Sequence, residues 1–396
     1  MRVLLTNFGT TGDVYPHIAL ATELSRRGHR PTLALSPYFE PLVEEYGLDF
    51  LPIGSDLGRI QRDINNAMTV SPEIAGSAEK MNLLFSKLAS ALPQFFYQLK
   101  AAVQNFDVLV SGPMQPAARM VHELTGVPFA SVQVEHFGGG GTPAFQQVSR
   151  SLINPFRAQL KLPPLSHPLT KDANSPQLAL YAMSRHVCPP PVSWPAHHCM
   201  TGFFFLDKEG WKPDPELVEF IEAGEPPVVF TFGSMTHEDP NTLTSLLLKA
   251  ISHVGCRAII QRGWSGLADR KLPPNVHSIG YVQYSWLFPK AACVVHHGGP
   301  GTAGAAFRAG VPQIFVPHAW DQPIWAKLAQ GVSCAGPSIP YTELSFRNLS
   351  AAIASTLANH HYYQSAAQLS INIRAELGVQ KARQLIERLL DRIGLS

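Results

Sequence analysis

Two segments far apart in the chain share one pattern of residue types. Residues 2–24 (RVLLTNFGTTGDVYPHIALATEL) and residues 228–250 (VVFTFGSMTHEDPNTLTSLLLKA) both open with an apolar, β-rich run. Each then has Phe-Gly, a hydroxyl residue, a polar loop, a proline and a helix-like run. This order is typical of the first β-strand and α-helix of a doubly wound domain. Its occurrence twice predicts an α/β protein built from two Rossmann-like domains.

Strand and helix patterns alternate after both segments. Apolar runs predict these further strands: 32–36, 49–53, 107–111, 128–134, 258–261, 276–279, 293–296, 313–316 and 332–335. The first helix is predicted over 14–27, and Gly28 is suited to end it. Because 45% of the 396 residues are apolar and 15% are charged, the chain can bury two sizeable cores.

A proline-rich passage separates the two halves. Residues 188–195, followed by 201–205, predict an interdomain linker that ends near Pro227. The expected division is residues 1–205 for the first domain, 206–378 for the second, and 379–396 for a last helix.

Residues 58–105 form a long insertion of helical character. Its apolar residues are too many for one helical stripe, so they indicate either core or the wall of an apolar pocket. The set is Met81, Leu83, Leu84, Phe85, Leu88, Leu92, Phe95, Phe96 and Leu99.

Charge, cysteines and hydropathy argue against several classes of protein. A net charge of +2 and the lack of any Lys/Arg-rich run argue against a nucleic-acid partner. The five cysteines are scattered and form no Cys-x-x-Cys, which argues against a disulfide framework or zinc site and fits the cytoplasm. No transmembrane segment is expected, because no run of 18 apolar residues occurs. Weak peripheral membrane contact through the apolar insertion stays open.

The strongest chemical signal is the segment 294–326 (VVHHGGPGTAGAAFRAGVPQIFVPHAWDQPIWA). A strand, a small-residue turn from Gly298 to Thr302 and a helix start follow one another. The first-turn N–H groups of a helix lack internal partners and carry partial positive charge, so they bind anions. Glycines let the backbone approach the anion, and His297 can add an N–H. This chemistry suits a diphosphate.

A second strand in the same segment ends at Pro317. Asp321 and Gln322 follow it, so they are expected at the carboxyl end of a strand, where open α/β sheets bind ligands. An acid beside an amide suits several sugar hydroxyls.

The segment resembles the donor-binding signature of the nucleotide-sugar glycosyltransferases with the GT-B fold. It is most similar to the sterol glucosyltransferases and bacterial antibiotic glycosyltransferases, which have His-His-Gly-Gly-x-Gly-Thr and Asp-Gln-Pro segments. The resemblance extends more weakly over the whole chain. It implies two Rossmann-like domains that face each other across a cleft, with the last helix crossing back onto the first domain.

The resemblance also implies a set of donor-binding residues, with backbone groups near Val282 pairing with the base. The set is Ser234, Val282, His297, Gly299, Gly301, Thr302, Asp321 and Gln322. His296 is interpreted as structural, and Trp286 either stacks on the base or belongs to the core. Plant members place a Glu where Ala305 stands, and its absence leaves the nucleotide open between uridine and thymidine diphosphates. No metal site is expected.

Asp13 is the predicted catalytic residue. From the residues alone it is a helix N-cap, because Asp before a helix with a proline in its first turn is a normal start signal. The resemblance implies a general base, since sterol and antibiotic members carry Asp in Gly-x-x-Gly-Asp here. His17, one turn later, either touches the acceptor, orients Asp13 or is simply packed. His136, in Glu135-His136-Phe137, leads into a glycine loop that either lines the acceptor site or only connects elements.

The resemblance implies an inverting, metal-independent hexosyltransferase. The sugar, glucose in the first instance, would pass from a nucleoside diphosphate such as UDP to a hydroxyl of a lipophilic acceptor. A sterol is the first choice, and a polyketide, glycopeptide or carotenoid is the alternative. Two other classes stay open: a nucleotide-sugar epimerase and a catalytically silent sugar-nucleotide-binding protein. No cofactor is expected beyond the sugar nucleotide itself.

Overall fold

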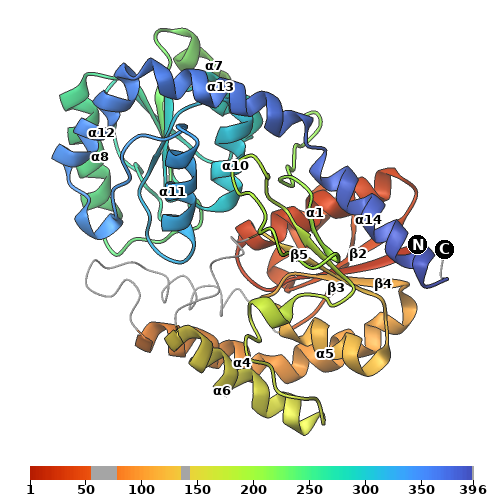
Figure 1. Ribbon diagram of the computed structural model, residues 1–396. Helices are drawn as coiled ribbons and strands as arrows, with labels where there is room; N and C mark the ends of the chain where they lie inside the picture. Colours follow the sequence, from red (N-terminus) through yellow and green to blue (C-terminus); the bar gives the residue numbers. More distant parts are fainter. Residues whose placement is uncertain (55–77, 135–142, 395–396) are drawn as a thin grey trace.

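The computed structural model describes residues 1–54, 78–134 and 143–394 (Figure 1). Within these residues, seven parallel strands form one sheet in the order β3-β2-β1-β4-β5-β6-β7. Five parallel strands form a second sheet in the order β10-β9-β8-β11-β12. The predicted α/β architecture of two doubly wound halves is therefore confirmed.

The N-terminal half contains the first sheet. Its strands are β1 (Arg2–Thr6), β2 (Arg30–Leu35), β3 (Asp49–Pro52), β4 (Val108–Ser111), β5 (Phe129–Gln133), β6 (Leu178–Tyr181) and β7 (His198–Met200). Its described helices are α1 (Thr11–Arg26), α2 (Glu40–Glu45), α4 (Ala78–Ala102), α5 (Pro116–Thr125) and α6 (Pro143–Gln159), with short 3-10 turns at Pro37–Phe39, Val103–Asn105 and Lys171–Ala173.

The C-terminal half contains the second sheet. Its strands are β8 (Val228–Thr231), β9 (Ala258–Gln261), β10 (Val276–Ile279), β11 (Cys293–His296) and β12 (Gln313–Phe315). Its helices are α7 (Pro215–Glu222), α8 (Pro240–Val254), α9 (Tyr284–Leu287), α10 (Pro300–Ala309), α11 (Gln322–Gly331), α12 (Phe346–Ala358), α13 (His360–Ala375) and α14 (Gly378–Arg392), with 3-10 turns at Phe288–Lys290 and Tyr341–Glu343.

Three details of the sequence interpretation are wrong. Strands β6 and β7 were not predicted. The proline-rich passage 188–195 connects these two strands, so it lies inside the N-terminal half and is not the linker. Residues 332–335 form no strand, and only an isolated bridge joins Gln313 to Ala335. Prolines interrupt a strand, but they do not determine which sheet the next strand joins, and that choice depends on distant partners.

The apolar insertion contributes to the core of the N-terminal half. Leu92, Phe95, Phe96 and Leu99 of α4 are all at most 2% exposed and pack in one cluster with residues of α5 and α6. The core interpretation is confirmed for these four residues. The remaining side chains of the set, from Met81 to Leu88, lie outside the described part of the structure.

A shared apolar cluster joins the two halves. Phe203, in the segment that leaves β7, packs on Phe307 of α10 and Trp325 of α11, with ring centroids 6.3 and 5.9 Å away. The contact is close, because a Cβ added to Gly304 would lie 2.8 Å from the Phe203 ring. The crossing segment is therefore packed into the C-terminal half.

The last helix, α14, packs on the N-terminal half beside α1 (Figure 1). Its residues Ala382, Ile386, Leu389 and Leu390 are buried in the same cluster as β1 and α1. Polar contacts also cross between the halves, including an ion pair of Lys208 with Glu45. These contacts hold the carboxyl edges of the two sheets near each other.

Candidate functional site

Three loops of the C-terminal half begin at one edge of its sheet. Strand β11 lies between β8 and β12, with His296 paired to Thr231 on one side and to Phe315 on the other. Because the strands are parallel, the loops that follow them emerge side by side. They contain Ser234, His297 and Asp321, which places three of the predicted donor residues at this edge.

The loop after β11 opens directly into α10. Gly298 has a φ of +96°, a conformation that L side chains rarely adopt, and Gly299 precedes the first helical residue. Pro300 occupies the first helical position, where its missing N–H costs nothing. A Cβ added to Gly301 would meet no atom within 4 Å, so space is open beside this helix start. The arrangement is that of an anion site, with N–H groups and the positive end of the helix dipole beside open space.

His297 lies against this turn. A Cβ on Gly299 would lie 2.4 Å from the His297 Nε2 atom, and a Cβ on Gly233 would lie 3.0 Å from its Cε1. The ring is only 8% exposed, and burial lowers the pKa of His297 to about 4. Without an anion at the site, His297 is therefore a neutral imidazole.

His296 has a structural role, as interpreted from the sequence. Its Nδ1 accepts the N–H of Gly298 at 3.1 Å, and its Nε2 lies 2.9 Å from Oε1 of Gln313. The backbone donor fixes the tautomer, so Nε2 carries the hydrogen. His296 therefore holds the glycine turn in place from inside the sheet.

The other predicted donor residues around α10 differ in accessibility. Ser234 is half-buried just after β8. Thr302 is 8% exposed, and its hydroxyl is hydrogen-bonded to that of Tyr284. Val282 is 3% exposed and packs in an apolar cluster, so only its backbone is available to a ligand. Trp286 is half-buried against Trp211, with ring centroids 5.8 Å apart.

Asp321 and Gln322 stand at the start of α11. Oδ2 of Asp321 accepts a 2.7 Å hydrogen bond from the Trp325 indole N–H, which fixes the carboxylate. Oε1 of Gln322 accepts the N–H groups of His318 at 2.7 Å and Ala319 at 3.1 Å. The Gln322 amide oxygen therefore shapes the loop, while its NH₂ donates to Sδ of Met235 at 3.6 Å, so only the second N–H remains for the predicted contact with a sugar.

Asp13 lies in the first turn of α1 and not at its N-cap, which corrects one of the two readings. The helix begins at Thr11 with Thr10 as the cap, and Oδ2 of Asp13 reaches back to the Thr10 N–H at 2.7 Å. Thr10 Oγ1 lies 3.3 Å from the same oxygen. The sequence placed Asp13 at the cap itself, but the helix begins earlier, because the threonine and glycine before Asp13 also adopt helical geometry. Its carboxylate instead makes the return contact of a capping box.

The Asp13 carboxyl group has a raised pKa. Burial raises the pKa of Asp13 from 3.8 to about 6, against the opposing effect of the Thr10 hydrogen bonds. The negative charge of Asp321 adds to the rise, so the two carboxylates, one from each half, lie within electrostatic reach. A carboxyl group of the N-terminal half thus lies close to the predicted donor site of the C-terminal half.

The structure describes one of the two residues predicted to contact the acceptor, and the acceptor role of both stays a prediction. His17 is fully buried, and its Nδ1 lies 3.0 Å from the backbone oxygen of Asp13, so it supports the helix turn and does not contact the carboxylate. His136 and the glycine loop after it lie outside the described residues.

Sequence reasoning missed two features at the same edge. His237 and His318 form a buried hydrogen-bonded pair with a 3.0 Å contact between their Nε2 atoms. Trp320, immediately before Asp321, is 45% exposed, has a φ of +61° and makes an edge contact with Phe145 of α6, from the other half. All three residues lie in segments that the sequence analysis singled out, but their partners are distant in the chain.

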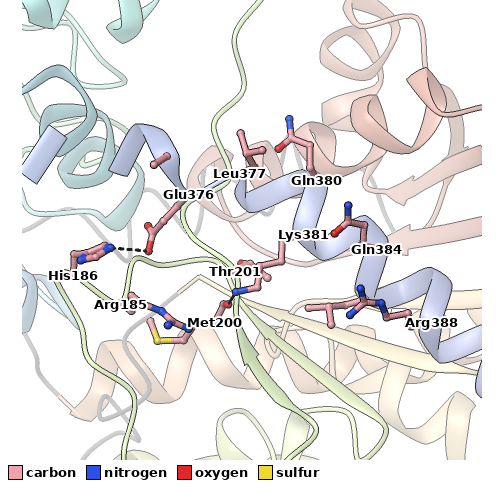
Figure 2. A pocket seen from close by; sticks show the side chains of 12 residues that line it. Arg185, His186, Met200, Thr201, Glu376, Leu377, Gln380, Lys381, Gln384 and Arg388 are labelled. Atoms are coloured by element: carbon pink, nitrogen blue, oxygen red, sulfur yellow. Dashed lines mark hydrogen bonds and ion pairs between the residues drawn. The ribbon is translucent and has the colours of Figure 1, made fainter. Parts of the chain in front are cut away.

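A cavity of about 470 Å³ lies away from this edge, where α14 leaves α13 (Figure 2). Figure 2 shows Arg185, Lys381 and Arg388 around it, with His186 3.9 Å from Glu376. None of the predicted site residues lines it. Within residues 1–54, 78–134 and 143–394, no group of three His, Cys, Asp or Glu side chains is arranged to hold a metal ion. In the same residues no helix is long and apolar enough to cross a membrane.

Family models match both halves of the chain. Residues 3–136 match the glycosyltransferase family 28 N-terminal domain. Residues 245–387 match the C-terminal domain of erythromycin biosynthesis protein CIII-like proteins.

Curated relatives match along nearly the whole chain. The O-mycaminosyltylonolide 6-deoxyallosyltransferase of Streptomyces fradiae is 30% identical over 98% of this chain and 97% of its own length. The sterol 3-beta-glucosyltransferase of Pichia angusta is 28% identical over 97% of this chain. The present chain spans only 33% of that fungal enzyme, and 64% of a sterol 3-beta-glucosyltransferase of Arabidopsis thaliana that is 30% identical.

Solved structures share the fold. The glycosyltransferase of kitacinnamycin has a TM-score of 0.77 at 20% identity, covering 98% of this chain and 99% of its own. Glycosyltransferase VinC, solved in complex with dTDP, has a TM-score of 0.74 at 20% identity, covering 99% of this chain and 100% of its own. The two-sheet architecture, the glycine-rich start of α10 and these relatives agree, and the chain belongs to the GT-B nucleotide-sugar glycosyltransferases that include the sterol and bacterial antibiotic enzymes.

Proposed function

We propose that this glycosyltransferase moves a hexose, with inversion, from a nucleoside diphosphate sugar to a hydroxyl group of a lipophilic acceptor. The observation that carries the proposal is the approach of Asp13, from the N-terminal half, to Asp321, beside the glycine-rich start of α10. A base and an anion site from different halves are what a direct displacement between two substrates requires.

In the proposed reaction Asp13 accepts the proton of the acceptor hydroxyl. The acceptor oxygen forms a bond to the anomeric carbon while the bond from that carbon to the diphosphate oxygen breaks. The electron pair of the broken bond stays on the leaving diphosphate. A base whose pKa is about 6 is mostly ionised at pH 7 and remains basic enough to take the proton.

The leaving group gains negative charge as the bond breaks. The first-turn N–H groups of α10 and the His297 ring are the groups we assign to stabilise it, with Ser234 at the neighbouring strand end. Preorganised donors of this kind are worth about 3 kcal/mol each when they face a developing charge. The proposal uses these dipoles and no metal ion.

The donor is proposed to be UDP-glucose, bound by the predicted donor residues. Ala305, 8% exposed in α10, has no group that reaches ribose hydroxyls, so dTDP-glucose is the alternative donor. One neighbouring structure, that of VinC, contains dTDP.

A sterol is the acceptor we propose first. Several relatives that align with nearly the whole chain are sterol 3-beta-glucosyltransferases. A polyketide aglycone is the second candidate, because the Streptomyces fradiae relative matches this chain over 97% of its own length. We infer that the enzyme meets its acceptor in the cytoplasm, with weak peripheral contact to a membrane where the acceptor is a membrane lipid.

The test is mass spectrometry of products from UDP-glucose and dTDP-glucose, each crossed with sterol, flavonoid, carotenoid and macrolide acceptors. The expected product is a sterol that has gained one hexose, and Asp13→Ala is expected to abolish it while donor binding persists. A changed sugar nucleotide without any acceptor would favour an epimerase. Donor binding without any product would favour a silent binding protein.

A further inference from the structure

Two histidines that the proposed reaction leaves unused lie within electrostatic reach of His297. His237 follows β8 and His318 follows β12, the two strands that flank β11, and the two side chains are 6% and 7% exposed. Their Nε2 atoms lie 3.0 Å apart, a hydrogen-bond distance. The charge state of His297 affects both of them. Together with His296, the site edge therefore holds four buried imidazoles among the described residues.

The neighbouring groups determine where the hydrogens of the pair lie. Nδ1 of His318 is 2.7 Å from the backbone oxygen of Val316, which can only accept. Nδ1 of His318 therefore carries a hydrogen, and Nε2 of the neutral ring accepts. Nε2 of His237 must then donate to it. At the other side of His237, Nδ1 lies 2.7 Å from Oγ of Ser265.

This chain of hydrogen bonds is complete only with one additional proton. When His237 is neutral, the Ser265 hydroxyl must donate its single hydrogen to Nδ1 of His237. The backbone oxygen of Met235, 3.1 Å from Oγ of Ser265, then receives no hydrogen bond from Ser265. When His237 is an imidazolium, Nδ1 donates to Ser265, and Ser265 donates to Met235. Each polar atom along this chain of hydrogen bonds, from the Met235 oxygen at one end to the Val316 oxygen at the other, then has a partner. The local geometry thus suits a pair with one positive charge.

The surroundings keep the pair neutral while no anion is present. Burial lowers the pKa of His237 to about 4 and holds that of His318 well below its usual value, and a charged His297 would lower both further. Tyr341 stacks on His318 with ring centroids 4.3 Å apart, and its ring centroid lies 5.3 Å from that of His237, a distance at which an aromatic ring favours a cation.

Two carboxylates lie farther out. Glu238 and Asp239 are exposed and interact with Tyr341, so solvent screens their effect on the pair. No other charged side chain in the described part of the chain is a cause of the pKa shifts of His237 or His318. The arrival of a multivalent anion at the start of α10 would therefore be the main change in charge that the pair experiences.

We infer that the His237–His318 pair takes up one proton when the donor diphosphate binds, and that the resulting imidazolium helps to hold the leaving nucleoside diphosphate. The inference rests on the proposed function, because the anion is the diphosphate of the donor. Neither histidine has a ring nitrogen left for direct contact with the donor, so both are positioning residues that act through charge. Donor affinity should fall as pH rises, whereas Asp13 must lose its proton to act.

The experiment is calorimetric titration of the full chain with UDP-glucose, and in parallel with dTDP-glucose, in two buffers of different ionisation enthalpy. Each phosphate of these probes is esterified and keeps a fixed charge near neutrality, so any proton uptake belongs to the protein. We expect uptake approaching one proton per donor at pH 6 in Asp13→Asn, where the carboxyl with a pKa of about 6 near the donor site is absent. The variants below carry the same substitution. We also expect affinity to fall by up to about tenfold per pH unit between the pKa of the free pair and that of the bound pair, and to level off above the latter.

Two variants assign the proton. His237→Gln keeps a polar group beside Ser265 but cannot hold the charge, so uptake and the pH dependence of affinity should disappear. Ser265→Ala removes the acceptor of the Nδ1 hydrogen and should reduce uptake in a chain whose buried pair is intact. The control is His253→Gln, an exposed histidine at the end of α8, which should bind like the wild type. Thermal melts verify that each variant is folded.

The outcomes separate the two proposals. Donor binding without proton uptake, or uptake that persists in both His237→Gln and Ser265→Ala, overturns this inference and leaves the proposed function standing. Failure of both nucleotide sugars to bind the wild type overturns the proposed function and this inference with it.

Discussion

The carboxylates of Asp13 and Asp321 come from opposite halves of the molecule and repel each other. The charge of Asp321 adds to the burial that raises the pKa of Asp13 to about 6. Asp321 is held by the Trp325 indole N–H, and Asp13 by the backbone N–H of Thr10. Each acid is therefore fixed from its own half, and the approach between them depends on how the halves pack.

Replacing Asp13 with Asn should abolish most turnover and retain donor binding. The amide keeps an oxygen for the Thr10 N–H but cannot accept the acceptor proton. We expect kcat to fall by about 10²–10⁴-fold, the usual range for loss of a general base. Steady-state kinetics and donor calorimetry check this. A parallel loss of donor affinity would contradict the role of Asp13 as the base.

The pH–rate profile should report the same carboxylate. Because the base must be ionised and the pKa of Asp13 is about 6, kcat/KM for the acceptor should fall as pH drops through 6. When the donor is saturating, kcat/KM for the acceptor should not change with pH above pH 7. The residual activity of Asp13→Asn, measured over the same range, should lack this limb. A wild-type profile that is flat between pH 5 and 8 would rule out the assignment.

Asp13→Asn should also stabilise the protein at high pH. The folded-state pKa of Asp13 is raised, so its favourable contribution is present below the unfolded pKa of 3.8 and is lost as pH rises through about 6. The variant should therefore melt about 2 °C or more above the wild type at pH 8. At pH 4 the two proteins should have the same melting temperature.

Asp107→Asn is the matched control for that melt. Its hydrogen bonds with Arg2 hold the pKa of Asp107 below its usual value, so the sign is reversed. Asp107→Asn should lower the melting temperature at pH 8. Shifts of the same sign in the two variants would contradict the proposed origin of the Asp13 effect.

Gly301→Ala should block the donor without disturbing the fold. A Cβ there meets no protein atom within 4 Å, so the methyl group would project only into the space assigned to the diphosphate. We expect donor affinity to drop by about tenfold or more, with the melting temperature unchanged or higher. Gly331→Ala, equally free of contacts but at the end of α11, is the control that should bind donor normally.

His297→Ala and His296→Ala should have different effects. Loss of His297 removes a donor from the anion site, so turnover should fall by about 10²–10³-fold and donor affinity should weaken, with little change in melting temperature. Loss of His296 removes the contacts to Gly298 and Gln313, so the melting temperature should fall first. Equal melting temperatures in the two variants would contradict this division of roles.

The sequence alone was sufficient for the parts of the site whose geometry is local. The glycines around Gly299 specify the tight turn and the helix start within a few residues, and Asp13 lies one strand and one turn from the N-terminus. These features need no distant partner, since helix caps and left-handed turns depend on neighbours in the chain. The alternation of strands and helices likewise predicted both doubly wound halves.

Tertiary packing decided everything that joins residues distant in the sequence. Strand β7 is three residues long, and only its pairing with β6 shows that the proline-rich passage belongs to the first half. The His237–His318 pair and the approach of Asp13 to Asp321 depend on which strand ends lie side by side and on how the halves dock. A buried pKa depends on desolvation and on charges from every packed element, and therefore only the folded molecule sets it.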